Sequence, residues 1–184
     1  IARAVLAALG EAHRLGVIHR DVKPANVLFD EAGVTRLGDF GVAHLGDLSA
    51  TATAGVIGTL GYMSPEQREG RPASVRSDLY GVGAMLWEML TGERPEASSS
   101  GATMRTRPSG VHRDLDARHD QLVLGFLAVD PEARPEDAFA ARRALGSVKW
   151  PSMIERVAGP RSERPRSEHP TEARLGEPLP DGSA

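Results

Sequence analysis

The residues of this chain best suited to chemistry lie in one short stretch, residues 19–26 (HRDVKPAN). Asp21, Lys23 and Asn26 provide a carboxylate, an ammonium group and an amide oxygen within six residues. A carboxylate can accept a proton from a hydroxyl group, an ammonium group can offset charge on a transferring phosphate, and an amide oxygen can bind magnesium. The stretch therefore suits phosphoryl transfer, although Asp, Asn and Pro are also ordinary turn formers.

The sequence around this stretch predicts a loop followed by a short hairpin. Pro24 has no N–H and interrupts any helix, so we expect Asp21 and Asn26 on irregular backbone before an apolar strand at residues 27–29. A turn containing Gly33 and a second short strand at residues 34–37 come next. Asp39 begins the tripeptide DFG as the chain leaves this hairpin.

Three motifs occur in an order that resembles the signature of eukaryotic-type (Hanks-type) serine/threonine protein kinases of the bacterial kind. They are HRDVKPAN at residues 19–26, DFG at residues 39–41 and SPE at residues 64–66, where that family has Ala-Pro-Glu. Each motif is weak evidence alone, but the three together are specific. The resemblance implies that residues 19–26 are the catalytic loop, and that the fold is α+β and mainly α-helical, with the short hairpin beside this loop. It covers only the large, C-terminal lobe of a kinase.

The resemblance also implies roles for individual residues in transferring the γ-phosphate of ATP to protein Ser/Thr hydroxyls. Asp21 would orient and deprotonate the substrate hydroxyl, and Lys23 would stabilise the moving phosphate. Asn26 and Asp39 would hold Mg²⁺. Leu28 would lie below the adenine of ATP. The lysine two residues after the aspartate favours serine/threonine over tyrosine specificity.

Residues 42–63 are rich in Ala, Gly, Ser and Thr and resemble an activation loop. Thr51 and Thr53 are the candidate phosphorylation positions, and Arg20 is the family residue that clamps such a phosphate. Thr59 matches the position where serine/threonine kinases hold a hydroxyl against the catalytic aspartate and lysine. The alternative is that these threonines are only small polar loop residues.

Two apolar segments predict helices that support the catalytic loop. Residues 1–15, with Leu15 on the apolar face, predict a helix that packs in the core. Residues 77–91 are apolar nearly all round and predict a buried helix that starts near Asp78. The resemblance implies that Asp78 accepts hydrogen bonds from the catalytic-loop backbone, and that Met85 and Met89 pack beneath Leu28. A simple helix cap is the alternative for Asp78.

The rest of the chain follows the family pattern less evenly. Residues 93–114 read as loop where the family usually has a docking helix, and helices are expected within 115–129 and over 136–145. The resemblance implies that Arg134 pairs with Glu66, and a surface arginine is the alternative. We predict a kinase large-lobe domain over residues 1–146 and a Pro-rich, disordered tail over 147–184, whose start Trp150 and Ile154 would tie to the domain.

Composition limits the class of protein further. The formal net charge of −3 argues against nucleic acid as the main partner, and the absence of cysteine excludes disulfides and fits a cytoplasmic location. No apolar run is long enough to span a membrane. The first residue, Ile1, suggests a piece of a longer protein.

No glycine-rich loop precedes the catalytic loop, so the small lobe of a kinase is missing from this sequence. Beside protein substrates, a small lobe from upstream sequence or from another chain is therefore an expected partner. The alternatives are a non-catalytic kinase-like interaction module, an inactive truncated fragment, or a small-molecule phosphotransferase of kinase-like fold. The SPE motif and the long loop before it argue against the last of these.

Overall fold

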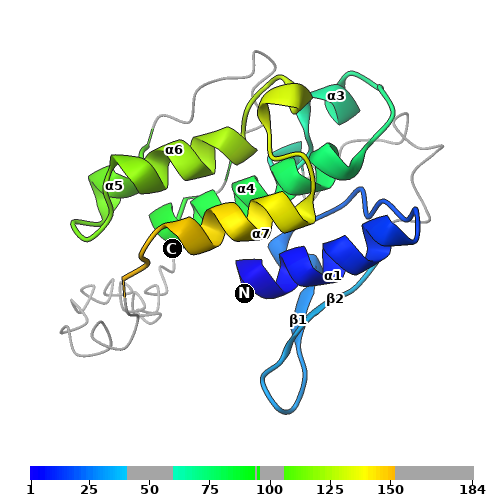
Figure 1. The fold of residues 1–184 in the computed structure, drawn as a ribbon, viewed down its shortest axis with the longest axis horizontal. Coiled ribbons are helices and arrows are strands. Elements are labelled where there is room, and N and C mark those ends of the chain that lie inside the picture. Colours follow the sequence, from blue (N-terminus) through cyan, green and yellow to red (C-terminus); the bar gives the residue numbers. More distant parts are fainter. Residues whose placement is uncertain (41–59, 94, 96–105, 152–184) are drawn as a thin grey trace, which may run out of the picture. The chain divides into compact units, whose positions relative to one another are not determined.

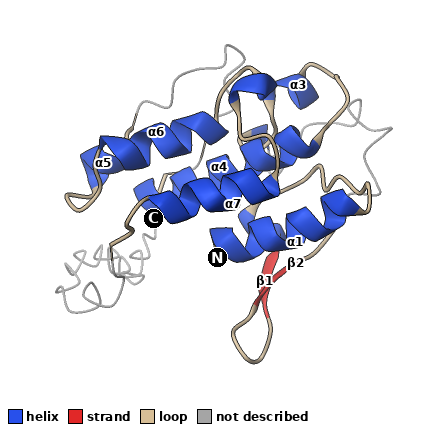
Figure 2. Cartoon of the chain, in the orientation of Figure 1, coloured by secondary structure: helices blue, strands red, loops and turns tan. Residues whose placement is uncertain are grey.

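The computed structural model describes residues 1–40, 60–93, 95 and 106–151. The chain divides into two compact units, residues 1–151 and 152–184, and all described residues belong to the first. Helices dominate this unit, beside two short strands (Figure 2). The elements in chain order are α1 (Ala2–Arg14), η1 (Pro24–Asn26), β1 (Val27–Phe29), β2 (Thr35–Leu37), α3 (Pro65–Arg68), α4 (Val75–Thr91), α5 (Pro108–Val111), α6 (Ala117–Phe126), η2 (Pro131–Ala133) and α7 (Ala138–Ser147).

Helix α4 is the centre of the fold, and helices α1, α6 and α7 pack against it (Figure 1). It begins after a capping box in which Ser74 and Ser77 bond each other's backbone N–H groups, and it ends at Gly92, whose φ of 74° is left-handed. Every residue from 77 to 87 is buried. A helix that is apolar on all sides is stable only inside a core, which confirms the prediction of a buried helix.

Two glycines let other parts of the chain approach α4 closely. A Cβ atom at Gly81 would lie 2.7 Å from the carbonyl oxygen of Val22, in the catalytic loop. At Gly83 it would lie 2.5 Å from the Cβ atom of Phe126 in α6. Any side chain at either position would therefore push the catalytic loop or α6 away from the central helix.

Helix α1 joins the catalytic loop to this core. Its apolar face carries Val5, Leu6 and Leu9, each no more than 1% exposed, and packs against α4 and α7. Strands β1 and β2 form an antiparallel pair in which Leu28 lies opposite Arg36. The predicted hairpin is thus confirmed, with its second strand one residue shorter than expected.

Several expectations about these elements are wrong in detail. Leu15 is 79% exposed because α1 has ended at Arg14, and Met89 is 42% exposed because the last turn of α4 leaves the core, whereas Met85 is buried. Helix α4 begins at Val75, before Asp78. Residues predicted as irregular or loop form single turns at η1 and α5, each of which has a proline in its first turn, where a missing N–H costs nothing.

Beyond α7 the described chain remains attached to the domain through Trp150. Its indole N–H donates to the carbonyl of Leu145 over 2.8 Å, and its ring makes an edge contact with His119 at 5.0 Å between centroids. The expected anchoring by Trp150 is confirmed. Residues 147–151 of the predicted tail belong to the described domain, with Ser147 as the last residue of α7, whereas Ile154 and the rest of residues 152–184 lie outside the described residues. None of the helices in the described part is both long and apolar enough to cross a membrane.

Candidate active site

The backbone of the catalytic loop is attached to α4 through Asp78. This carboxylate is fully buried and accepts hydrogen bonds from the backbone N–H of His19 at 2.8 Å and of Arg20 at 2.7 Å. The ring of His13, from α1, lies 2.8 Å from the same carboxylate. The expected hydrogen bonds from the loop to Asp78 are present, and the alternative of a simple helix cap is wrong because Ser74 caps α4.

Two residues of the site have left-handed backbone although they are not glycine. Arg20 has φ of 72° and Asp39 has φ of 53°. Such a conformation costs on the order of 1–3 kcal/mol and persists only where the surrounding structure enforces it. The hydrogen bond from Arg20 N–H to Asp78 is one part of that enforcement.

Asp21 lies at the centre of a small polar cluster. Its Oδ2 atom is 2.7 Å from Nζ of Lys23 and accepts a hydrogen bond of 3.2 Å from Nδ2 of Asn26. The same Asn26 nitrogen donates to the Asp21 carbonyl over 2.8 Å, which closes the loop through the single turn of η1. Both contacts to the carboxylate use Oδ2. No group of the described residues bonds Oδ1, so this oxygen can accept a proton from a substrate hydroxyl.

His19 connects the loop to the segment that carries Asp39. Its Nδ1 atom accepts a hydrogen bond of 3.3 Å from the backbone N–H of Asp21, which leaves Nε2 as the donor to the carbonyl of Gly38 at 2.9 Å. The His19 ring also packs against Phe40, with 4.6 Å between centroids. Gly38 N–H donates to the carbonyl of Asn26 over 2.9 Å. Asp39 is therefore bracketed by two residues fixed to the catalytic loop.

The chemistry of Asn26 and Asp39 fits the magnesium ion that the sequence implies. Asn26 uses its nitrogen for both bonds to Asp21, so its amide oxygen has no hydrogen bond within the described residues. Asp39 is exposed, and its carboxylate has no described partner. Mg²⁺ prefers oxygen ligands and usually takes one or two protein groups together with phosphate and water. One amide oxygen and one carboxylate are such a set.

The remaining predicted site residues are only partly described. Leu28 is 56% exposed on β1, which leaves its side chain accessible to a ligand. Arg20 is exposed beside the loop. Thr51, Thr53 and Thr59 lie outside the described residues, so their predicted roles stay predictions.

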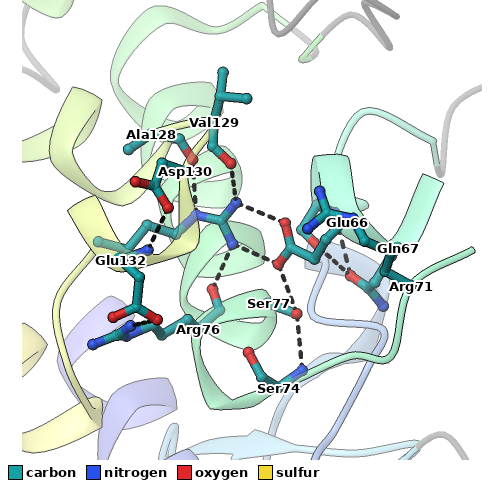
Figure 3. A network of polar contacts seen from close by, with 12 residues as sticks. Glu66, Gln67, Arg71, Ser74, Arg76, Ser77, Ala128, Val129, Asp130 and Glu132 are labelled. Carbon is teal, nitrogen blue, oxygen red and sulfur yellow. Dashed lines mark hydrogen bonds and ion pairs between the residues drawn. The ribbon is translucent and has the colours of Figure 1, made fainter. Parts of the chain in front are cut away.

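A second polar cluster joins α3 to the C-terminal part of the domain (Figure 3). The carboxylate of Glu66, 4% exposed, accepts two hydrogen bonds from the fully buried guanidinium of Arg134, at 2.7 and 2.8 Å. Ser77 donates a third at 2.8 Å. Arg134 also donates to the carbonyls of Arg76, Ala128 and Val129. The predicted pair is present, and the alternative of a surface arginine is wrong.

The residues around Glu66 determine its state of ionisation. Burial alone would raise its pKa, but hydrogen bonds from Arg134, its own backbone N–H and Ser77, with the nearby positive charge, lower the pKa to about 2. Glu66 is therefore ionised at neutral pH in spite of its burial. Arg76 and Glu132 form a further ion pair at the edge of this cluster, which joins α4 to η2 (Figure 3).

Sequence reasoning missed three contacts at the site. His13, within the helix predicted at residues 1–15, bonds Asp78 of α4. Tyr62 donates its hydroxyl to Glu88 of α4, which attaches the segment before α3 to the core. Gln67, the residue after SPE, bonds the backbone of Arg20. No local sequence signal marks any of the three, because each contact joins residues far apart in the chain.

Comparison with known proteins places the chain in a family. A family model described as the protein kinase domain matches residues 1–145. The chain belongs to the protein kinase family. The match runs from α1 into α7, and therefore includes both polar clusters described above.

Curated relatives point to one branch of this family. The chain is 41% identical over 152 residues to the serine/threonine-protein kinase PknB of Mycobacterium tuberculosis, which covers 77% of this chain and 24% of the relative. It is 41% identical over 141 residues to a probable serine/threonine-protein kinase PknB of Bifidobacterium longum, covering 71% of the chain and 20% of the relative. The chain thus spans between a fifth and a quarter of the length of these bacterial relatives, both named as serine/threonine-protein kinases, the second as a probable one.

A solved structure agrees with this placement. The crystal structure of the PknI kinase domain of Mycobacterium tuberculosis superposes with a TM-score of 0.60 at 26% sequence identity, covering 79% of this chain and 54% of that one. The expected kinase-like fold, helix-rich with a small two-stranded sheet, is confirmed.

Proposed function

We propose that this chain is the large lobe of a serine/threonine protein kinase and supplies the groups that transfer the γ-phosphate of ATP to protein hydroxyls. The observation that supports this proposal most strongly is the arrangement of contacts around Asp21. One carboxylate oxygen contacts Lys23 and Asn26, and the other has no described partner. A fixed carboxylate with one free oxygen, beside an ammonium group, is suited to accept a hydroxyl proton and to offset charge on the phosphate in in-line phosphoryl transfer.

In this proposal each site residue contributes one atom or group to the reaction. Oδ1 of Asp21 accepts the proton of the substrate hydroxyl, and Nζ of Lys23 lies beside the phosphate during transfer. The amide oxygen of Asn26 and the carboxylate of Asp39 hold Mg²⁺, which neutralises charge on the phosphates when it is bound. Exposed Leu28 offers an apolar surface to adenine. The small lobe that would cover the nucleotide comes from other sequence, upstream or on another chain.

The decisive experiment measures transfer of labelled phosphate from ATP to a Ser/Thr peptide library, with this chain mixed with a separately expressed small lobe of the PknB relative. Asp21→Asn keeps the shape of the side chain but cannot act as a base, so transfer should fall by at least about 10²-fold. Asp30→Asn is the matched control, because Asp30 is an aspartate of the hairpin turn paired with Arg36. Full activity in Asp21→Asn would overturn the proposal.

A titration of the chain alone with Mg·ATP gives a second, independent readout. Binding near 1 mM corresponds to about 4 kcal/mol and should be lost in Asp39→Asn. Phosphate transfer to tyrosine only, or an Asp39→Asn variant that binds Mg·ATP as tightly as the unmodified chain, would contradict the assignment. A folded chain without binding or transfer would favour the non-catalytic interaction module.

A further inference from the structure

Gln67 makes two kinds of contact with its single amide group. Its Oε1 atom accepts hydrogen bonds from the backbone N–H and the hydroxyl of Ser64, at 3.2 and 2.8 Å, and so caps helix α3. Its Nε2 atom donates to the carbonyl of Arg20 over 2.8 Å, across 47 residues of sequence. Glu66, the neighbouring residue of α3, points instead to Ser77 and the buried cluster (Figure 3).

The carbonyl that Gln67 bonds belongs to the peptide unit between Arg20 and Asp21. The nitrogen of this same unit, Asp21 N–H, donates to His19 Nδ1. The preceding N–H, that of Arg20, donates to Asp78. The orientation of the peptide plane that leads directly into Asp21 is thus fixed at both of its polar atoms.

This restraint matters because the backbone at Arg20 is left-handed, with φ of 72°. A non-glycine residue returns to a less strained conformation when the bonds that enforce it are removed. Rotation of the peptide between Arg20 and Asp21 would carry the carboxylate of Asp21 with it. A displacement of about 1 Å at a reacting group can cost about 10²-fold in rate.

We propose that Gln67 is a positioning residue for Asp21, which couples the segment after SPE to the catalytic loop through the Arg20 carbonyl. The inference rests on the proposed role of Asp21 for its effect on transfer, but not for its effect on the loop backbone. When α3 is in place, the peptide plane before Asp21 is fixed. When α3 moves away, this restraint is released.

Gln67→Glu separates the two functions of the side chain. A carboxylate oxygen still accepts the hydrogen bonds from Ser64, so the cap of α3 is kept. The second oxygen replaces the donor and faces the Arg20 carbonyl, where two acceptors repel each other. Gln121→Glu is the matched control, since it makes the same chemical change at an exposed position of α6.

The first measurement is amide hydrogen exchange by NMR on the complete chain. In Gln67→Glu we expect exchange at the N–H groups of Arg20 and Asp21 to be at least tenfold faster, with unchanged exchange in α4 and an unchanged melting temperature. Gln121→Glu should match the unmodified chain. Unchanged exchange at both amides would overturn the inference, and so would a uniform increase throughout the domain, because Gln67 would then be only structural.

The second measurement is phosphate transfer in the mixture with the small lobe. We expect kcat to fall about 30-fold in Gln67→Glu while KM for ATP changes less than threefold. An unchanged kcat beside an inactive Asp21→Asn would overturn the coupling to catalysis. If exchange is faster in Gln67→Glu but even the unmodified chain shows no transfer in the mixture, the proposed function is contradicted. The positioning of the loop by Gln67 is then still supported.

Discussion

Two buried carboxylates lie near the start of α4, and the structure compensates their charges in different ways. Glu66 faces a guanidinium group that bonds both of its oxygens. Asp78 accepts hydrogen bonds from two backbone N–H groups and contacts a histidine ring. The first carboxylate joins distant helices to each other, while the second fixes the loop that carries the candidate base. The comparison suggests that charge pairing supports the domain, whereas backbone hydrogen bonds set the geometry of the site.

The largest expected effect follows from removing the charge partner of Glu66. Arg134→Met leaves a buried, ionised carboxylate, which typically costs about 3–5 kcal/mol. Urea unfolding of the complete chain measures this loss. The double variant Glu66→Gln/Arg134→Met removes both charges and should recover more than half of it. A loss below about 1 kcal/mol in the single variant would show that the pair is not buried in solution.

A smaller loss of stability, with a larger effect on the site, is expected for Asp78→Ala. The substitution leaves two buried backbone N–H groups without an acceptor, and each unsatisfied group costs about 1–3 kcal/mol of unfolding free energy. Because water can enter the space, the total loss should be about 3 kcal/mol. Asp78→Asn keeps one oxygen and should lose about half as much. Unfolding measures the loss, and exchange at the His19 and Arg20 amides should rise in both variants. Unchanged exchange there would contradict the role of Asp78 as the loop anchor.

The smallest expected effect is on how the free energy of unfolding depends on pH, as far as this dependence comes from the pair of Glu66 and Arg134. The pKa of Glu66 is lowered to about 2 in the folded protein from an ordinary value of 4.5, so its stabilisation is present above pH 4.5 and is lost as the pH falls toward 2. Between pH 5 and pH 3 this loss amounts to about 2 kcal/mol. The slope of unfolding free energy against pH should therefore be shallower in Glu66→Gln/Arg134→Met. Equal slopes in this range would contradict the lowered pKa.

Sequence reasoning correctly predicted those parts of the molecule that follow a known motif or a regular apolar pattern. The strand at residues 27–29, the buried helix around Asp78 and the pair of Glu66 with Arg134 follow from motifs or apolar periodicity. Short turns at prolines were harder to predict. Pro24, which was expected to interrupt any helix, begins the single turn η1, and Pro108, within a stretch predicted as loop, begins α5, since the first position of a helix needs no N–H.

Contacts that depend on tertiary position could not be read from the sequence. Gln67 follows a recognisable motif, but its bond to Arg20 spans 47 residues and has no local signature. The exposure of Met89 reflects where the core ends along α4, which apolar periodicity does not specify. The predicted chemistry of Asp21, Lys23, Asn26 and Asp39 fits their surroundings, and their roles in transfer remain for the variants to test.

The pair between Glu66 and Arg134 has a consequence for the order of events on the ribosome. The two residues are 68 positions apart. At roughly 5–20 residues per second, synthesis of the intervening chain takes on the order of 3–14 s. Throughout that interval the carboxylate of Glu66 lacks the guanidinium that bonds both of its oxygens in the folded domain, so its burial would be uncompensated by that partner. We therefore expect α3 to dock only after α4, α6 and Arg134 have been made, so that the segment next to the candidate catalytic loop is completed late.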